Sequence, residues 1–291
     1  MQKTIATTQL NSSTYAKKCD VVFMRNDANP YVTSNTSFED IKDGCVIYCW
    51  STYIPQLFQY LENTNTKNIT LLTGDNDHSC NCTGGIRVFP MDNISYYFPP
   101  VPKNITKWYA QNAEVYNAKL VPMPIGLAPP WRTDVYLENT CMNDIFIDLD
   151  RINLIYSNFN TTTNPVRRTI KNIISKNCNI DTEYNDLLTY YKNIQTHKFV
   201  ICPPGNGLDT HRVWECLYFG AIPIVEDNSM NRYFSSLFPI LVVDSWCDIT
   251  QEFLENEFKK FNNHKTWRYD LLDVDNWFQF NNIKCLKDAI Q

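Results

Sequence analysis

The residues best suited to chemistry lie within one stretch of 28 residues, from Lys198 to Val225. Two glycines, Gly205 and Gly207, precede Arg212 and Glu215. Glycine lets the backbone turn tightly and approach a ligand. A guanidinium offers a rigid fork of donors to phosphate oxygens, and a carboxylate three residues further along a helix can accept hydrogen bonds from ribose hydroxyls. These residue types predict a site for a nucleotide diphosphate.

The pattern around these residues predicts the elements that must position them. Lys198–Cys202 is an apolar run typical of a strand, and His211–Phe219 has the spacing of a helix that stops at Gly220 before a second strand, Ile222–Val225. A strand, helix and strand of this length form a compact βαβ unit, and ligands of such sheets bind beyond the carboxyl ends of the strands. We therefore expect the loop 203–210 at the mouth of a cleft.

The loop and the first turns of the helix supply the candidate ligands. We expect Asp209 or Thr210 to cap the helix, whose first N–H groups would face an anion. An alternative is that Arg212 and Glu215 form a surface ion pair and that the glycines only make a turn. Their position after a glycine loop at the end of a strand favours the binding site. The donor-binding candidates are Gly205, Asn206, Gly207, Asp209, Thr210, His211, Arg212 and Glu215.

Strands and helices alternate along most of the chain, which predicts an α/β fold with parallel sheets covered on both faces. We expect a helix at Trp108–Lys119 and, because of its prolines, an edge strand that runs into a loop at Leu120–Leu127. The other predicted strands are Val21–Met24, Cys45–Trp50, Ile69–Thr73, Ile152–Ser157 and Ile240–Val243. The other predicted helices are Ile54–Glu62, Arg167–Lys176, Tyr184–Lys192 and Trp277–Ile290.

A polar, acidic stretch with two adjacent prolines precedes residue 150 and indicates a domain boundary near residue 148. The expected domains are residues 1–148 and 149–291, two Rossmann-like domains of which the second binds the nucleotide. The final helix could return to the first domain. A chain of 291 residues with 44% hydrophobic residues can bury a core in each.

Composition excludes several classes of function. The formal net charge of −5 argues against non-specific binding of nucleic acid. No apolar run reaches the length of a transmembrane segment, and the first residues lack the apolar centre of a signal peptide, so we expect a soluble, cytoplasmic protein. The eleven cysteines mostly lie in apolar runs without zinc-site spacing, which indicates reduced core thiols.

The segment Cys202–Glu215, followed by Gly220–Val225, resembles the donor-site signature of exostosin-like glycosyltransferases, especially the short stand-alone members found in bacteria and large viruses. The likeness covers roughly residues 45–245. Shorter supporting matches are Trp108–Asn112, Pro122–Leu127, Ser157–Asn160 and Asn164–Arg167.

This resemblance implies a GT-B enzyme, in which two Rossmann-like domains face across a cleft and no metal or other cofactor is essential. The C-terminal domain would hold a nucleotide sugar, with Arg212 on the diphosphate, Glu215 on the ribose and Arg167 as a further phosphate candidate. The N-terminal domain would hold a glycan or glycoprotein acceptor, with Trp108 and Asn112 on the acceptor side.

An inverting transfer needs a base that removes the proton of the acceptor hydroxyl. Asp77, Asp75 and His78 follow a predicted strand at the expected edge, and we favour Asp77, although a turn in which the aspartates bond only to backbone N–H groups explains the same residues. Three DxD patterns match metal-binding glycosyltransferases, yet so short a pattern recurs by chance. They are Asp75–Asp77, Asp148–Asp150 and Asp273–Asp275.

The leading hypothesis is an inverting, metal-independent glycosyltransferase that moves a sugar from a UDP-sugar, with UDP-xylose as one option, to a glycan hydroxyl. The rival is a catalytically silent glycan-binding or scaffold protein of the same fold. The usual GxGxxG and GxxxxGK[ST] patterns of dinucleotide and ATP sites are missing from the signature, which disfavours hydride transfer and ATP hydrolysis.

Overall fold

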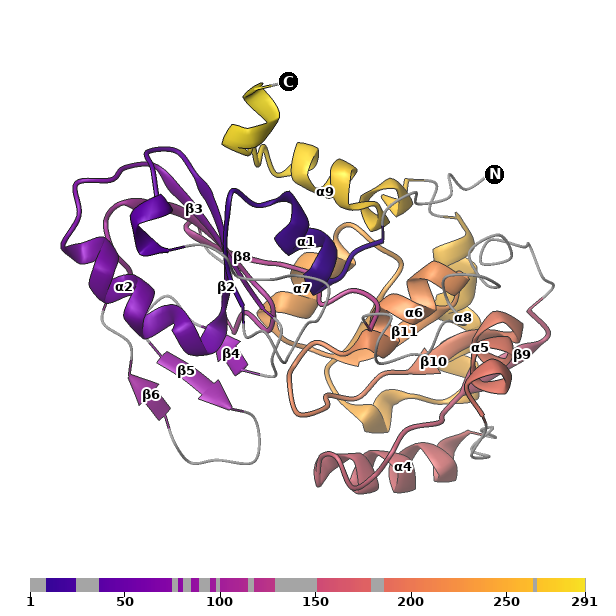
Figure 1. Cartoon of the computed structure of the whole chain (residues 1–291). Coiled ribbons are helices and arrows are strands. Elements are labelled where there is room, and N and C mark those ends of the chain that lie inside the picture. Colours follow the sequence, from indigo (N-terminus) through magenta and orange to yellow (C-terminus); the bar gives the residue numbers. More distant parts are fainter. Residues whose placement is uncertain are drawn as a thin grey trace. The chain divides into compact units, whose positions relative to one another are not determined.

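The computed structural model divides the chain into two compact units (Figure 1). The N-terminal unit consists of Ala6–Pro129, Gly207–Asp209 and Leu271–Gln291, and the C-terminal unit consists chiefly of Pro130–Asn206 and Thr210–Asp270. The residues described are 9–24, 37–74, 78–80, 85–88, 95–97, 100–114, 118–128, 151–178, 186–263 and 266–290.

A five-stranded sheet of order β1-β2-β3-β7-β8 forms the centre of the N-terminal unit. Every neighbouring pair in it is parallel. Its strands are β1 (Val21–Phe23), β2 (Val46–Trp50), β3 (Ile69–Gly74), β7 (Ile105–Ala110) and β8 (Leu120–Pro122). A small antiparallel sheet follows β3 in the chain and contains β4 (His78–Cys80), β5 (Gly85–Val88) and β6 (Ser95–Tyr97).

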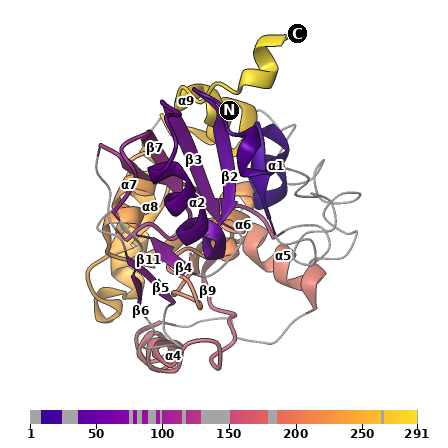
Figure 2. The ribbon, with the colours of Figure 1, turned by 60° about the vertical axis from the view of Figure 1, so that its left-hand side comes forward.

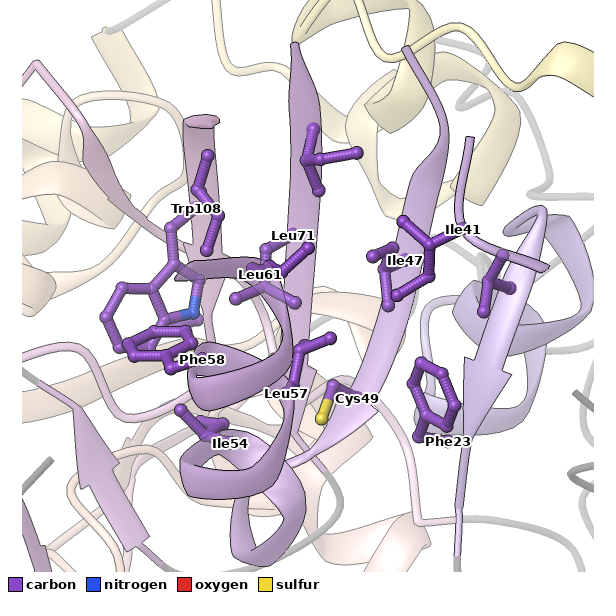
Figure 3. Close-up of a cluster of buried hydrophobic side chains, with 14 of the residues drawn as sticks. Phe23, Ile41, Ile47, Cys49, Ile54, Leu57, Phe58, Leu61, Leu71 and Trp108 are labelled. Carbon is purple, nitrogen blue, oxygen red and sulfur yellow. The ribbon is translucent and has the colours of Figure 1, made fainter. Parts of the chain in front are cut away.

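Helix α2 (Ile54–Glu62) covers one face of this sheet (Figure 2). Its apolar residues recur every three to four positions and form one buried stripe, while Pro55 fits the first turn, where no helical N–H is lost. The ring of Phe58 meets the ring of Trp108 edge-on at 5.7 Å (Figure 3). The stripe consists of Ile54, Leu57, Phe58 and Leu61.

The last residues of the chain belong to the N-terminal unit. Helix α9 (Val274–Phe280) is followed by Asn281, whose carbonyl accepts a hydrogen bond of 3.0 Å from the Tyr109 hydroxyl. Near the start of the sequence, helix α1 (Ser12–Lys18) begins with a capping box between Asn11 and Thr14. Its last residue, Lys18, forms an ion pair with Asp275 of α9. The two sequence ends are therefore parts of one core.

The C-terminal unit contains a second parallel sheet, of order β12-β11-β10-β9. Its strands are β9 (Asn153–Tyr156), β10 (His197–Ile201), β11 (Ile222–Glu226) and β12 (Leu241–Val243). Its helices are α4 (Val166–Asn177), α5 (Leu187–Thr196), α6 (His211–Phe219), α7 (Ser229–Ser235) and α8 (Gln251–Asn263). Short buried strands that alternate with helices produce this all-parallel arrangement.

The prediction of an α/β fold with parallel sheets is confirmed. The predicted strand, loop, helix and strand around the glycine loop form β10, α6 and β11, and Gly220 ends α6 in the left-handed conformation with a φ of 78°. Residues Leu120–Pro122 form an edge strand, as their prolines predicted.

The predicted helix at Trp108–Lys119 is wrong. Its first residues complete β7, which lies between β3 and β8, and Trp108, Tyr109 and Ala110 are buried in succession. Consecutive buried residues are typical of a central parallel strand, whereas a surface helix buries only one face. The helix predicted for Trp277–Ile290 is also shorter than expected, because Asn282 has a φ of 54° and separates α9 from a short 3₁₀ turn at Leu286–Ile290.

Eight described cysteines are unpaired, and seven of them are buried, as predicted for core positions, whereas Cys247 is exposed. Burial raises the pKa of Cys45 to about 11, so this thiol stays protonated near neutral pH. Within the described residues, every helix is too short or too polar to span a lipid bilayer.

The close approach of Leu10 to Gly126 predicts a large effect of a single methyl group. Gly126 has a φ of 69°, and a Cβ atom there would collide with the Leu10 carbonyl, whereas Gly44, with a φ of 77°, has room for a Cβ 3.9 Å from Leu286. We expect Gly44→Ala to lower the free energy of unfolding by about 1–2 kcal/mol through backbone strain alone. Gly126→Ala should lower it by about 3–5 kcal/mol, because the clash adds to the same strain.

Urea denaturation followed by circular dichroism measures both variants. Equal losses for the two substitutions would contradict a tight contact between residue 126 and the N-terminal segment.

Candidate functional site

A pocket of about 770 Å³ opens in the C-terminal unit. It is formed by the segment that follows β9 and by the start of α6, which follows the loop after β10. Because β9 and β10 are neighbouring parallel strands, both segments lie at the carboxyl edge of the sheet, where α/β folds bind ligands. The pocket is lined by Asn158, Phe159, Asn160, Thr161, Lys171, Leu187, Tyr190, Thr210, His211, Arg212 and Glu215.

The guanidinium of Arg212 is fixed on three sides. Its Nη2 atom donates a hydrogen bond of 2.6 Å to the carbonyl of Asn158. Its central carbon lies 5.6 Å from the ring centre of Tyr190 and 6.0 Å from that of Phe159, distances at which a cation is attracted to an aromatic face. Burial alone would lower the pKa of Arg212, but Tyr190, Cys202 and Glu215 raise it above the ordinary value. The side chain is thus a permanently charged group in a fixed orientation.

Two buried polar atoms at the start of α6 lack a hydrogen-bond partner. They are the Nε atom of Arg212 and the Oγ1 atom of Thr210, neither of which finds an acceptor or donor among the described residues. Thr210 occupies the N-cap position of α6 but makes no capping hydrogen bond, so the expected cap from this residue is not formed. Buried polar groups are normally satisfied, because an unsatisfied one costs about 1–3 kcal/mol. Both residues also line the pocket, so a ligand with acceptor oxygens would bind beside them.

Glu215 lies one turn further along α6 and is only 8% exposed. Its Oε2 atom accepts a hydrogen bond of 2.7 Å from the hydroxyl of Tyr190, which comes from α5. The alternative of a surface ion pair between Arg212 and Glu215 does not fit this burial or these partners. The carboxylate instead forms part of the pocket lining.

Positive charge gathers around the pocket. Burial and the neighbouring charge of Arg212 lower the pKa of Arg167 to about 10, which indicates that the two cations repel each other. Lys171 projects from α4 into the pocket lining, and within the described part of the chain its ammonium has no hydrogen bond or ion pair. An anion in the pocket would relieve this repulsion.

Arg167 itself has a structural task. It is 6% exposed, and it donates hydrogen bonds to the carbonyls of Pro204 at 2.8 Å, Asn160 at 3.1 Å and Pro203 at 3.4 Å. These bonds tie the loop after β9 to the loop after β10. Arg167 is not part of the pocket lining, so its position argues against the direct phosphate contact considered from the sequence.

The residues of the glycine loop before Thr210 make contacts within the protein rather than line the pocket. The Gly205 carbonyl accepts a hydrogen bond from Asn164, and neither Gly205 nor Asn206 lines the pocket. Gly207 and Asp209 belong to the N-terminal unit. A Cβ atom at Gly207 would lie 2.7 Å from the Oδ1 atom of Asn112, so glycine is required there by close approach rather than by its φ angle.

Asp209 and Asn112 hold each other in place. The Asn112 side chain accepts a hydrogen bond of 2.8 Å from the Asp209 N–H, and the Asp209 carboxylate accepts one of 2.8 Å from the Ile125 N–H. Asn112 is fully buried and has a φ of 54°, and Asp209 is 4% exposed. This burial favours a structural role for both residues over contact with an acceptor or donor.

Trp108 also lies in the interior. Its side chain is 2% exposed, packs against Phe58 and donates a 2.8 Å hydrogen bond from Nε1 to the Thr73 hydroxyl (Figure 3). A fully packed ring has no face open to a sugar, which argues against the acceptor-side role considered for it. Of the candidate bases, Asp75 and Asp77 lie outside the described residues, and for His78 the structure describes only the backbone, as the first residue of β4.

Of the three DxD patterns, Asp273–Asp275 lies within the described residues, and its first aspartate caps a helix. The Asp273 side chain caps α9 by accepting hydrogen bonds from the N–H groups of Asp275 and Asn276. Among the residues that the structure describes, no group of three or more acidic, histidine or cysteine side chains could hold a metal ion.

No model of a known protein family matches the chain, and a comparison with curated proteins finds no match. Of the residues expected to bind the donor, the pocket brings together Thr210, His211, Arg212 and Glu215. It adds residues that sequence reasoning missed, above all Lys171 and Tyr190, which come from other helices.

The contacts of Arg167 predict that this residue stabilises the C-terminal unit. Arg167→Ala removes three hydrogen bonds to carbonyl groups and should lower the free energy of unfolding by about 3 kcal/mol. The exposed neighbour Arg168 is a matched control. Arg168→Ala should change the stability by less than about 0.5 kcal/mol. Thermal or urea unfolding measures both, and similar small effects would show that the bonds of Arg167 contribute little.

Proposed function

We propose that this protein is a glycosyltransferase that takes a sugar from a nucleotide diphosphate donor, most simply a UDP-sugar, and transfers it to a hydroxyl of a glycan or glycoprotein. In this proposal the two units with parallel sheets form a GT-B enzyme, the pocket of the C-terminal unit binds the donor, and the reaction inverts the anomeric carbon without an essential metal ion.

The buried Arg212 Nε atom without a partner carries this proposal. The Arg212 guanidinium is a charged hydrogen-bond donor at the carboxyl edge of a parallel sheet. Together with the unpartnered Thr210 hydroxyl at the start of α6, it suits the acceptor oxygens of a diphosphate. Glu215 lies in the same pocket and is suited to accept hydrogen bonds from ribose hydroxyls. The resemblance of this segment to the exostosin-like signature assigns the same roles to both residues.

The proposed chemistry needs a nucleoside diphosphate to leave from the anomeric carbon. Arg212 and Lys171 would stabilise the negative charge that develops on the leaving phosphate, because fixed positive groups act most strongly where charge appears in the transition state. The acceptor proton would go to a base of the N-terminal unit, for which Asp77, Asp75 and His78 stay the candidates.

Calorimetry with UDP and GDP tests the central proposal. Arg212→Gln keeps a polar side chain but removes the charge, and we expect the affinity for UDP to fall at least about a hundredfold because a charged fork to phosphate is lost. Arg168→Gln, which makes the same change of charge outside the pocket, should bind UDP normally. Circular dichroism checks that both variants are folded.

Unchanged binding in Arg212→Gln would remove Arg212 from the site. A wild-type protein that binds glycans but no nucleotide would favour the catalytically silent glycan-binding protein. Release of UDP from UDP-xylose or another UDP-sugar, with and without EDTA, tests turnover and metal dependence directly.

Lys171 provides a separate test of where the diphosphate lies. Lys171→Ala should weaken UDP binding about fivefold, leave uridine binding unchanged and reduce the dependence of UDP binding on salt, since a half-exposed point charge acts through screened electrostatics. Lys176 is an exposed lysine on the same helix outside the pocket, so Lys176→Ala is the matched control. Equal effects of the two substitutions would show only a general influence of net charge.

A further inference from the structure

Tyr190 contacts both of the proposed donor-binding groups of α6, Arg212 and Glu215. Its hydroxyl donates to the Glu215 Oε2 atom at 2.7 Å, and its ring faces the Arg212 guanidinium at 5.6 Å. One side chain from α5 thus contacts both polar residues of α6. Removing the hydroxyl and removing the ring are chemically separable changes, which allows the two contacts to be tested independently.

The orientation of Tyr190 is set by the packing of α5. The next residue, Tyr191, is buried at 2% exposure, and its ring packs at 4.8 Å against Phe219 of α6. Ile194, one turn further, is fully buried, and Asp186 caps the start of the helix. The ring of Tyr190 also lies 6.2 Å from that of Tyr156 on β9. The hydroxyl therefore reaches Glu215 from a rigid element, and a ligand does not need to order it.

The Tyr190 hydroxyl is a donor at any physiological pH. Burial raises the pKa of Tyr190 well above its ordinary value of 10.0; the charge of Arg212 opposes this shift, and the Glu215 carboxylate adds to it. The neutral hydroxyl can donate only one hydrogen bond, and that bond goes to Oε2 of Glu215. This bond leaves the Oε1 atom of the pocket carboxylate as the oxygen that a ligand would use.

We propose that Tyr190 is a positioning residue that makes the pocket selective for ribonucleoside diphosphates. Its hydroxyl orients Glu215 to accept from a ribose hydroxyl, and its ring supports Arg212 for the diphosphate. This inference rests on the proposed function of the pocket. It goes beyond it because it assigns the selectivity between ribose and deoxyribose to a residue of α5 that would itself touch neither the reacting bond nor the phosphate.

Two substitutions separate the roles of the ring and the hydroxyl. The wild-type protein should prefer UDP to 2′-deoxy-UDP about tenfold, the value of one hydrogen bond to a charged acceptor. Tyr190→Phe should reduce this preference to about twofold and leave the affinity for inorganic pyrophosphate unchanged. Tyr190→Leu should also weaken pyrophosphate binding about fivefold, because the attraction between ring and guanidinium is lost. Tyr191→Phe is the matched control, since Tyr191 does not line the pocket.

A double-mutant cycle distinguishes a positioning role from a general loss of stability. Glu215→Gln should by itself reduce the preference for UDP over 2′-deoxy-UDP to about twofold, because a neutral amide is a weaker acceptor. Adding Tyr190→Phe to Glu215→Gln should then change the preference no further, since two residues in one hydrogen-bonded pair are not additive. A residue that only stabilised the fold would leave this ratio unchanged in every background.

The measurements are calorimetric titrations of UDP, 2′-deoxy-UDP and pyrophosphate, with GDP and 2′-deoxy-GDP used if GDP binds more tightly. A Tyr190→Phe protein that is folded and retains the wild-type preference overturns the positioning role while leaving the proposed function intact. Loss of the preference in Tyr191→Phe as well as in Tyr190→Phe also overturns it. A wild-type protein that binds none of these nucleotides overturns the proposed function and this inference with it.

Discussion

The position of the Arg212 guanidinium is the constraint on which the candidate site depends. A permanent charge in a largely buried position is stable only when its surroundings compensate for the lost water. Here a carbonyl from the segment after β9 and the faces of two aromatic rings supply part of that compensation. One N–H of the fork has no protein acceptor within the described residues. Such an incomplete arrangement is the usual condition of a side chain that completes its contacts with a ligand.

The fold positions this charge through two loops at one edge of a sheet. The segment with Asn158 follows strand β9, and the loop after strand β10 leads to the start of α6. The buried Arg167 joins the two segments by donating to backbone carbonyls of each. Two arginines near each other therefore have different roles, since each nitrogen of Arg167 donates to a backbone carbonyl, whereas the Nε atom of Arg212 has no partner among the described residues. The bond from Tyr190 to Glu215 extends the arrangement to a third element, α5. Charge, carboxylate and aromatic ring thus depend on the packing of one sheet and two helices.

The sequence predicts local features of this protein well and tertiary features poorly. The bounds of α2 and α6 follow from apolar spacing and from Gly220, all of which act over a few residues. Trp108 misled the helix prediction because burial on both faces of β7 depends on neighbouring strands that the local pattern does not contain. Arg212 and Glu215 could be found because they share one helix. Tyr190 and Lys171 could not, since which face of α5 or α4 meets the pocket is decided by packing across more than 20 residues of chain. Arg167 resembled a ligand by type alone, and only its contacts show otherwise.

The N-terminal unit is discontinuous in sequence, and this has a consequence for how the protein is made. Its core includes α9, and the N–H of Lys287 donates to the carboxylate of Asp20 across most of the length of the chain. The ribosome synthesises residue 20 long before residue 287, and the main part of the C-terminal unit is made in between. The nascent N-terminal segment therefore lacks part of its core during synthesis, and the C-terminal unit can fold before that core is complete. The N-terminal core can therefore be completed only after the strands of the C-terminal sheet have been synthesised.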